Sequence, residues 1–175
     1  MVACNIMFRK ENVMKRKIFV SLLALIICFT LGGCAFGTKE KTYTSHGLSV
    51  TMNDAFQEKS IVSQTVYLES TEAIFSALKE DFSALEAIGL GKNTSIKEYA
   101  KAVVANNNAE YEIKEEDGLT YFEYEKTVSG KDFYYLACVY KSDDAFWLIN
   151  FASENSNKEK YQPLFKRWAK TVKFE

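Results

Sequence analysis

The sequence predicts an α+β domain in which an antiparallel sheet of about six strands packs with helices. Between residues 111 and 153, four segments rich in aromatic and β-branched residues follow one another with only short polar separators. Separators of this kind join neighbouring antiparallel strands. Two further segments, around Tyr99 and around Trp168, have apolar residues at helical spacing. We expect their apolar faces to cover the sheet.

The domain is predicted to begin with a β-hairpin and a third strand. Lys41–Met52 has two strand-like halves on either side of the turn dipeptide His46-Gly47. Ile61–Ser70 is rich in the β-branched and aromatic residues that favour strands. The next segment, Glu72–Gly89, fits two structures: a strand followed by a short helix, or one helix throughout.

The clearest helix in the sequence is Thr94–Asn108. Ser95 and Glu98 have the spacing of a capping box, in which each side chain accepts a hydrogen bond from a backbone N–H at the helix start. The apolar stripe of this helix consists of Ile96, Tyr99, Ala100, Val103 and Val104. We therefore expect the helix to lie with this stripe against the sheet.

Four strands and a final helix are expected after this helix. The strands are 111–116, 120–126, 132–141 and 145–153, and they form a meander of adjacent antiparallel strands. The final helix places Tyr161, Leu164, Phe165 and Trp168 inward. Pro163 suits the first turn of that helix, where its missing N–H costs nothing, and Thr171–Glu175 has the pattern of a last short strand.

The order of these elements resembles that of the PsbP/DcrB-type lipoproteins. The resemblance rests on the hairpin, the strand "VYLES", the apolar "AIFSALKE", the helix "SIKEYA", the aromatic meander and the closing "FKRWAKTVKF", and it extends from Tyr43 to Glu175. It implies an α/β/α sandwich forming a single domain over residues 43–175. It implies binding and accessory roles but no reaction, cofactor or ligand.

The amino end has the features of a secretory signal. Three cations, Lys15 to Lys17, precede the uncharged segment Ile18–Leu31, which is shorter than the ~20 residues that a membrane-spanning helix needs. Met14 offers an alternative start, which would make residues 1–13 an extension upstream of the true amino terminus. Residues 1–33 are therefore predicted to be a signal peptide that is removed.

The segment Leu31-Gly-Gly-Cys34 resembles the lipobox of bacterial lipoproteins. The resemblance implies that the Cys34 thiol receives a diacylglyceryl group and that Cys34 becomes the first residue of the mature chain. Two acyl chains hold a protein stably at a membrane. We therefore expect residues 34–42 to be a lipidated cysteine and a short tether, with the domain on the extracytoplasmic side of the cell membrane.

Composition excludes two classes of function, nucleic-acid binding and polybasic binding to a membrane surface. After Cys34 there are 17 basic and 22 acidic residues, a net charge of about −5, whereas nucleic-acid binding needs a basic face. Cys138 is the one thiol that follows Cys34, so no internal disulfide is expected. Its apolar neighbours predict a buried, inert thiol.

No catalytic or metal site is predicted, and no cofactor. The single histidine, His46, lies in a predicted turn, and no His/Cys cluster with zinc-ligand spacing is present. Ser76 and Lys79 match an S-x-x-K pattern, but in a strand they would point to opposite faces. The acidic segment Glu112–Asp117 lacks the ligand spacing of a calcium loop.

Aromatic residues of the meander are the candidate binding residues. They are Tyr121, Tyr124, Tyr134, Tyr135, Tyr140 and Trp147. If helices cover only one face of the sheet, the other face exposes a tyrosine-rich surface of the kind found at interfaces. If helices cover both faces, which we favour, these residues belong to the core.

We therefore expect a membrane-anchored extracytoplasmic lipoprotein with a non-catalytic binding or accessory role. Its partners would be the lipid membrane, through acylated Cys34, and either an envelope protein or a small ligand. One alternative is a lipoprotein that binds a small molecule in an aromatic pocket. The other is a hydrolase that uses Ser76 or an acidic pair.

Overall fold

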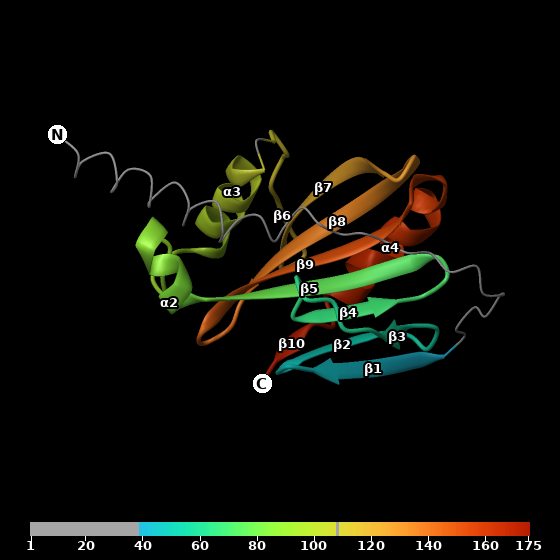
Figure 1. Cartoon of the computed structure of the whole chain (residues 1–175), viewed down its shortest axis with the longest axis horizontal. Coiled ribbons are helices and arrows are strands. Elements are labelled where there is room, and N and C mark those ends of the chain that lie inside the picture. The colour runs from blue at the N-terminus through green and yellow to red at the C-terminus, as the bar shows by residue number, and fades with distance from the viewer. Residues whose placement is uncertain (1–38, 108) are drawn as a thin grey trace.

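The computed structural model describes residues 39–107 and 109–175. Cys34, the signal sequence and the tether up to residue 38 lie outside the described residues. β1 begins at Glu40, inside the segment 34–42 that the sequence assigns to the tether. The carboxyl end of the chain lies beside the first hairpin (Figure 1), because Glu175 donates its backbone N–H to the carbonyl of Gly47 over 3.0 Å.

A seven-stranded antiparallel sheet forms the centre of the domain, in the order β3-β4-β5-β9-β8-β7-β6. Its strands are β3 (Gln57–Glu58), β4 (Val66–Glu69), β5 (Ala73–Asp81), β6 (Lys114–Glu116), β7 (Leu119–Val128), β8 (Lys131–Lys141) and β9 (Ala145–Glu154). The predicted meander is confirmed, since β6 to β9 are neighbours in sequence order. β5 joins this meander by pairing with β9 along its full length.

A smaller three-stranded sheet has the order β1-β2-β10. Its strands are β1 (Glu40–Ser45), β2 (Leu48–Asn53) and β10 (Lys173–Phe174). The predicted first hairpin and last short strand are therefore both present. The two sheets together contain more strands than the six or so that the sequence indicated, and the two-residue β3 is a strand that no sequence pattern predicted.

Three tight hairpins use the same kind of turn. In each, both central residues have positive φ, and the second is a glycine that adopts this conformation without strain. The pairs are His46-Gly47, Asp117-Gly118 and Ser129-Gly130. These are type I′ turns, whose twist matches that of the strands they join, and they fix the register of the β1–β2, β6–β7 and β7–β8 pairs.

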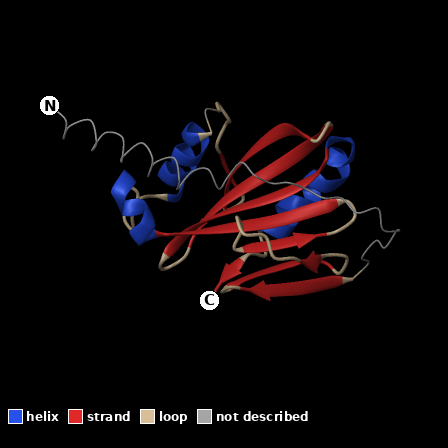
Figure 2. Cartoon of the chain, in the orientation of Figure 1, coloured by secondary structure: helices blue, strands red, loops and turns tan. Residues whose placement is uncertain are grey.

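Within residues 39–107 and 109–175, three α-helices and two short 3-10 turns accompany the sheets (Figure 2). They are α2 (Phe82–Leu85), η2 (Glu86–Ile88), α3 (Ile96–Asn106), η3 (Asn155–Asn157) and α4 (Lys158–Ala169). Glu72–Gly89 thus contains a strand and then a short helix, the first of the two predicted alternatives. The segment ends at Gly89, which has a left-handed φ of 79°.

Helices cover the seven-stranded sheet on both faces (Figure 1). One face packs against α4 and the three-stranded sheet through a large cluster that includes Phe75, Cys138 and Phe165. The other face packs against α2 and α3 through a second cluster that includes Tyr99 and Phe146, whose rings stack 4.3 Å apart. The predicted α+β sandwich is confirmed.

Two local predictions are wrong. The third strand was expected over Ile61–Ser70, but β4 starts only at Val66, because Ile61 to Thr65 form a turn whose hydrogen bond runs from Gln64 N–H to the Ile61 carbonyl. Pro163 was expected in the first turn of the last helix, but α4 begins at Lys158 and contains Pro163 in its interior. Burial of Tyr161 and Phe165 on either side of the proline keeps this turn helical.

Candidate functional site

The six aromatic residues proposed from the sequence lie on two different faces of the sheet. Tyr121, Tyr134, Tyr140 and Trp147 belong to the cluster under α4 and the three-stranded sheet. Tyr124 and Tyr135 lie on the face that α3 partly covers. Successive side chains of a strand alternate between faces, so the residues do not form one continuous surface.

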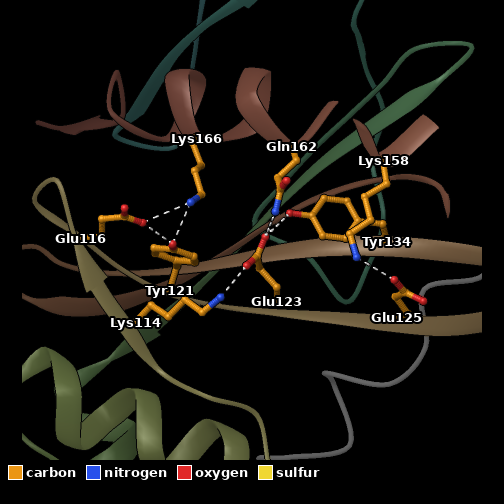
Figure 3. A network of polar contacts seen from close by, with 9 residues as sticks. All are labelled: Lys114, Glu116, Tyr121, Glu123, Glu125, Tyr134, Lys158, Gln162 and Lys166. Atoms are coloured by element: carbon orange, nitrogen blue, oxygen red, sulfur yellow. Dashed lines mark hydrogen bonds and ion pairs between the residues drawn. The ribbon is translucent and has the colours of Figure 1, made fainter. Parts of the chain in front are cut away.

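Under α4, the hydroxyl groups of Tyr121 and Tyr134 join a network of charged side chains (Figure 3). The Glu123 carboxylate accepts hydrogen bonds from Tyr134 Oη at 2.6 Å, Gln162 Nε2 at 2.6 Å and Lys114 Nζ at 3.0 Å. Burial alone would raise the pKa of Glu123. These three donors outweigh burial and lower that pKa to about 2.

The same network ties α4 to the edge of the sheet. Tyr121 Oη donates to Glu116 over 2.7 Å, and Lys166 Nζ from α4 lies 2.9 Å from Tyr121 Oη. Lys158, at the start of α4, pairs with Glu125 over 2.8 Å. Because these groups satisfy one another, this side of the sheet serves to hold the helix in place.

The opposite face of the sheet contains a cavity of about 310 Å³ beside the carboxyl end of α3. This volume lies at the small end of the range for ligand pockets. The lining residues are Asn107, Tyr111, Phe122, Tyr124, Glu125, Lys126, Leu148 and Asn150. They come from the end of α3, the segment that follows it, and strands β7 and β9.

Stacked aromatic rings form one side of this pocket. The ring of Tyr111 lies 5.1 Å from that of Tyr124, with 16° between their planes, and 5.7 Å from that of Phe122. Tyr124 in turn stacks on Tyr135 at 4.7 Å with an angle of 1°. Burial, with Tyr135 and Tyr111 beside it, raises the pKa of Tyr124, so its phenol is a neutral donor.

Polar groups lie at separate points around the pocket. Asn150 Oδ1 accepts a hydrogen bond from Tyr124 Oη at 3.4 Å. Asn107 Nδ2 caps α3 by donating to the Val103 carbonyl over 2.9 Å, which leaves its Oδ1 as an acceptor. Lys126 contributes the single cation of the lining. A few fixed polar groups among aromatic rings are typical of a small-molecule site.

A buried serine lies next to the pocket in the sheet. Ser76 on β5 is the register partner of Asn150 on β9, and directly opposite side chains are about 5 Å apart. The Ser76 hydroxyl is fully buried and has no hydrogen-bond partner among the described residues. Asn150 and Ser76 thus place two polar side chains next to each other on this face of the sheet.

The structure does not assemble the S-x-x-K pair. Lys79 lies on the other face of β5 from Ser76, and its Nζ pairs with Asp144 over 2.6 Å. The hydroxyl and the amine that a nucleophile and its base require are therefore separated by the sheet.

The histidine and the cysteine that the sequence analysis considered lie in a turn and in the core. His46 occupies a hairpin turn with φ 52°. Among the described residues, no three His, Cys, Asp or Glu side chains lie close enough together to hold a metal ion. Cys138 is buried, as predicted, and burial raises the pKa of its thiol to about 12.

A second, smaller cavity of about 210 Å³ lies between the two sheets. Its lining combines four apolar residues, Leu48, Val50, Val66 and Leu68, with Glu58 and residues 41–45 of β1. It contains no stacked ring pair, and its one tyrosine, Tyr43, already donates to the carbonyls of Asn53 and Phe56. We therefore regard the pocket beside α3 as the better candidate site.

The sequence matches no protein-family model and no curated protein. Solved structures with a similar fold do exist. Cyanobacterial PsbP (CyanoP) from Synechocystis sp. PCC 6803 aligns with a TM-score of 0.56 at 13% identity, over 83% of this chain and 99% of that chain. A protein from Bacteroides thetaiotaomicron VPI-5482 aligns with a TM-score of 0.51 at 12% identity, over 80% of this chain and 49% of that chain.

The domain has a PsbP-like fold. At these sequence identities the likeness concerns the fold alone and carries no information on function. None of the helices formed by residues 39–107 and 109–175 is both long and apolar enough to cross a membrane.

Proposed function

We propose that this chain is a membrane-tethered, non-catalytic binding protein whose ligand is a small molecule bound in the pocket beside α3. In this proposal, Cys34 carries the lipid that attaches the chain to the extracytoplasmic side of the cell membrane. The PsbP-like domain then presents the pocket to the surrounding compartment.

The observation that carries the proposal is the pocket lining. Tyr111, Phe122 and Tyr124 offer stacked rings, while Asn150 and Lys126 offer polar groups in the same 310 Å³ cavity. Aromatic rings contribute large contact areas at little conformational cost, and the polar groups set the orientation of a ligand. A binding role is also supported by the placement of Ser76 and Lys79 on opposite faces of β5.

A thermal-shift screen of the full chain against a library of small metabolites tests the binding proposal. A ligand at 100 times its Kd stabilises the folded state by about 2.7 kcal/mol, which raises the melting temperature measurably. Tyr111→Ala removes one ring from the pocket without touching a strand, so the shift caused by such a ligand should largely disappear.

The matched control is Tyr43→Ala, which removes another half-buried tyrosine from the three-stranded sheet. This variant melts at a lower temperature because it loses two hydrogen bonds, yet the shift caused by the ligand should persist. If no metabolite shifts the wild type, or if both variants lose the shift equally, the pocket is not the site. The envelope-protein partner would then be the remaining binding role.

Metabolic labelling with an alkyne fatty acid tests the tether. The wild-type chain should incorporate the label and sediment with membranes, whereas Cys34→Ala should do neither. Cys138→Ala is the control, because the Cys138 thiol is buried and its loss should leave labelling unchanged. Equal labelling of wild type and Cys34→Ala would overturn the lipid attachment.

A further inference from the structure

We propose that the ligand of the pocket beside α3 is a small flat ring that carries an anionic group, with the ring on the aromatic side and the anion at Lys126. This inference rests on the proposed function and adds the chemical class of the ligand. It follows from the charge, the donors and the size of the pocket, taken in turn.

The pocket carries an uncompensated positive charge. Its lining contains one carboxylate, Glu125, and one ammonium group, Lys126. Glu125 is already compensated, because Lys158 pairs with it over 2.8 Å and Asn155 Nδ2 donates to it over 3.1 Å. Among the described residues, Lys126 has no ion-pair partner. The local field therefore favours a ligand with a negative charge.

Asn150 on β9 gives the pocket lining a second hydrogen-bond donor. Asn150 uses its Oδ1 to accept from Tyr124, and within the described residues its Nδ2 makes no hydrogen bond. The lining therefore offers both an amide N–H and an ammonium group as donors. Together they match the oxygen atoms of a carboxylate, sulfonate or phosphate, because hydrogen bonds to a charged group are stronger than those to a neutral one.

The volume of the pocket and its aromatic rings determine the size and shape of the uncharged part of the ligand. At about 310 Å³, the cavity suits one ring or two fused rings with a short substituent. The near-parallel planes of Tyr111, Phe122 and Tyr124 favour a flat, apolar body that continues the stack. A flexible acyl chain would gain less from such a surface. A ring that bears an acidic group can stack on the aromatic side chains and also bind the donors of Lys126 and Asn150.

Two nearly isosteric probes isolate the charge: indole-3-acetate, which is anionic at neutral pH, and indole-3-acetamide, which is neutral. Isothermal titration calorimetry of the full chain in detergent gives the Kd of each, with detergent alone as the blank. We expect the acetate to bind about tenfold more tightly than the amide, which corresponds to about 1.4 kcal/mol.

Lys126→Met tests the assigned cation. The variant should weaken acetate binding about tenfold and leave the amide unchanged, since it removes the charge and keeps an unbranched side chain only one atom shorter. Lys173→Met is the matched control, because Lys173 is an exposed lysine on β10, outside the pocket. It should leave both dissociation constants unchanged. Added salt should weaken only the acetate.

The outcomes separate this inference from the proposed function. If both probes bind equally and Tyr111→Ala weakens both, the pocket is a binding site but the preference for anions is wrong. A preference for the acetate that survives Lys126→Met would overturn the assignment of Lys126. Failure of both probes to bind overturns this inference, and the metabolite screen then decides the proposed function by itself.

Discussion

Tyr134 and Tyr135 are adjacent in β8, but their rings lie on opposite faces of the sheet. Tyr134 packs on Phe165 of α4 and donates to Glu123, whereas Tyr135 stacks on Tyr124 beside the pocket. Of these two neighbouring tyrosines, Tyr134 therefore helps to hold α4 against the sheet, and Tyr135 supports the candidate site. Strand alternation decides which role each one has.

At the residue scale, Glu123→Gln should destabilise the domain at neutral pH by about 1–2 kcal/mol, after allowance for solvent screening. The pKa of Glu123 falls from 4.5 to about 2 on folding, owing to its three hydrogen-bond donors. Its contribution to the free energy of unfolding is therefore complete above about pH 4.5 and is lost as the pH falls toward 2. Urea unfolding at several pH values measures the difference.

The difference between wild type and Glu123→Gln should shrink toward zero across that acid range. The control is Glu154→Gln, which removes one end of a solvent-exposed ion pair with Lys131. It should cost about 0.5 kcal/mol or less. A Glu123→Gln effect that stays constant from pH 7 to pH 2 would show that the charge of Glu123 does not stabilise the fold.

At the scale of elements, the sequence correctly predicted a helix start and a tight turn, where the backbone requires particular residue types. Ser95 accepts from Glu98 N–H over 3.2 Å, and Glu98 accepts from Ser95 N–H over 2.8 Å, so the predicted capping box is confirmed. The dipeptide His46-Gly47 likewise forms the predicted turn. Neither signal depends on distant parts of the chain, which is why sequence alone could find it.

Ser95→Ala should lower the free energy of unfolding by about 1 kcal/mol, because it leaves the Glu98 N–H of α3 without its side-chain acceptor. Chemical unfolding of the full chain measures this loss. Thr94→Ala removes the neighbouring side chain, which instead accepts from Gly91 N–H, and it separates capping from general loss of a loop contact. An unchanged stability in Ser95→Ala would mean that packing of Tyr99 alone starts the helix.

Pro163 shows where local rules give way to packing. A proline inside a helix removes one backbone hydrogen bond and crowds the preceding turn, yet α4 continues through it because Tyr161, Phe165 and Trp168 are buried around it. Pro163→Ala should therefore raise the free energy of unfolding by about 1–3 kcal/mol, since the side chain is exposed and the turn is already helical. A lower stability in this variant, measured by thermal unfolding, would show that the proline ring stabilises the interior of α4.

At the scale of the whole molecule, α4 is held to the rest of the domain by ion pairs as well as by its apolar face. Its basic residues and the adjacent Lys170 pair with acids from several other elements. The pairs are Lys158–Glu125, Lys160–Glu72, Lys166–Glu116, Arg167–Glu40 and Lys170–Asp117. The charges of α4 are thus largely used within the domain, whereas Lys126 at the pocket has no such partner among the described residues.

The same scale explains why the sequence predicted the fold better than the site. Strand order follows from short turns, but the pocket combines Tyr111, Tyr124 and Asn150 from three separate segments. Only the packing of the residues after α3 onto β7 brings them together. Of these three residues only Tyr124 was named as a candidate from the sequence, and Asn150, which interrupts the apolar run "FWLINF", was a further signal that could have identified the pocket.

The central claim is that the pocket beside α3 is the binding site of this chain. Its most direct test is a titration of the isotope-labelled full chain with indole-3-acetate, followed by the amide chemical shifts. We predict that the largest shifts occur at Tyr111, Phe122 to Lys126 and Leu148 to Asn150. Shifts centred instead on Lys41 to Ser45 and Val66 to Leu68, or spread evenly over the domain, would contradict the claim.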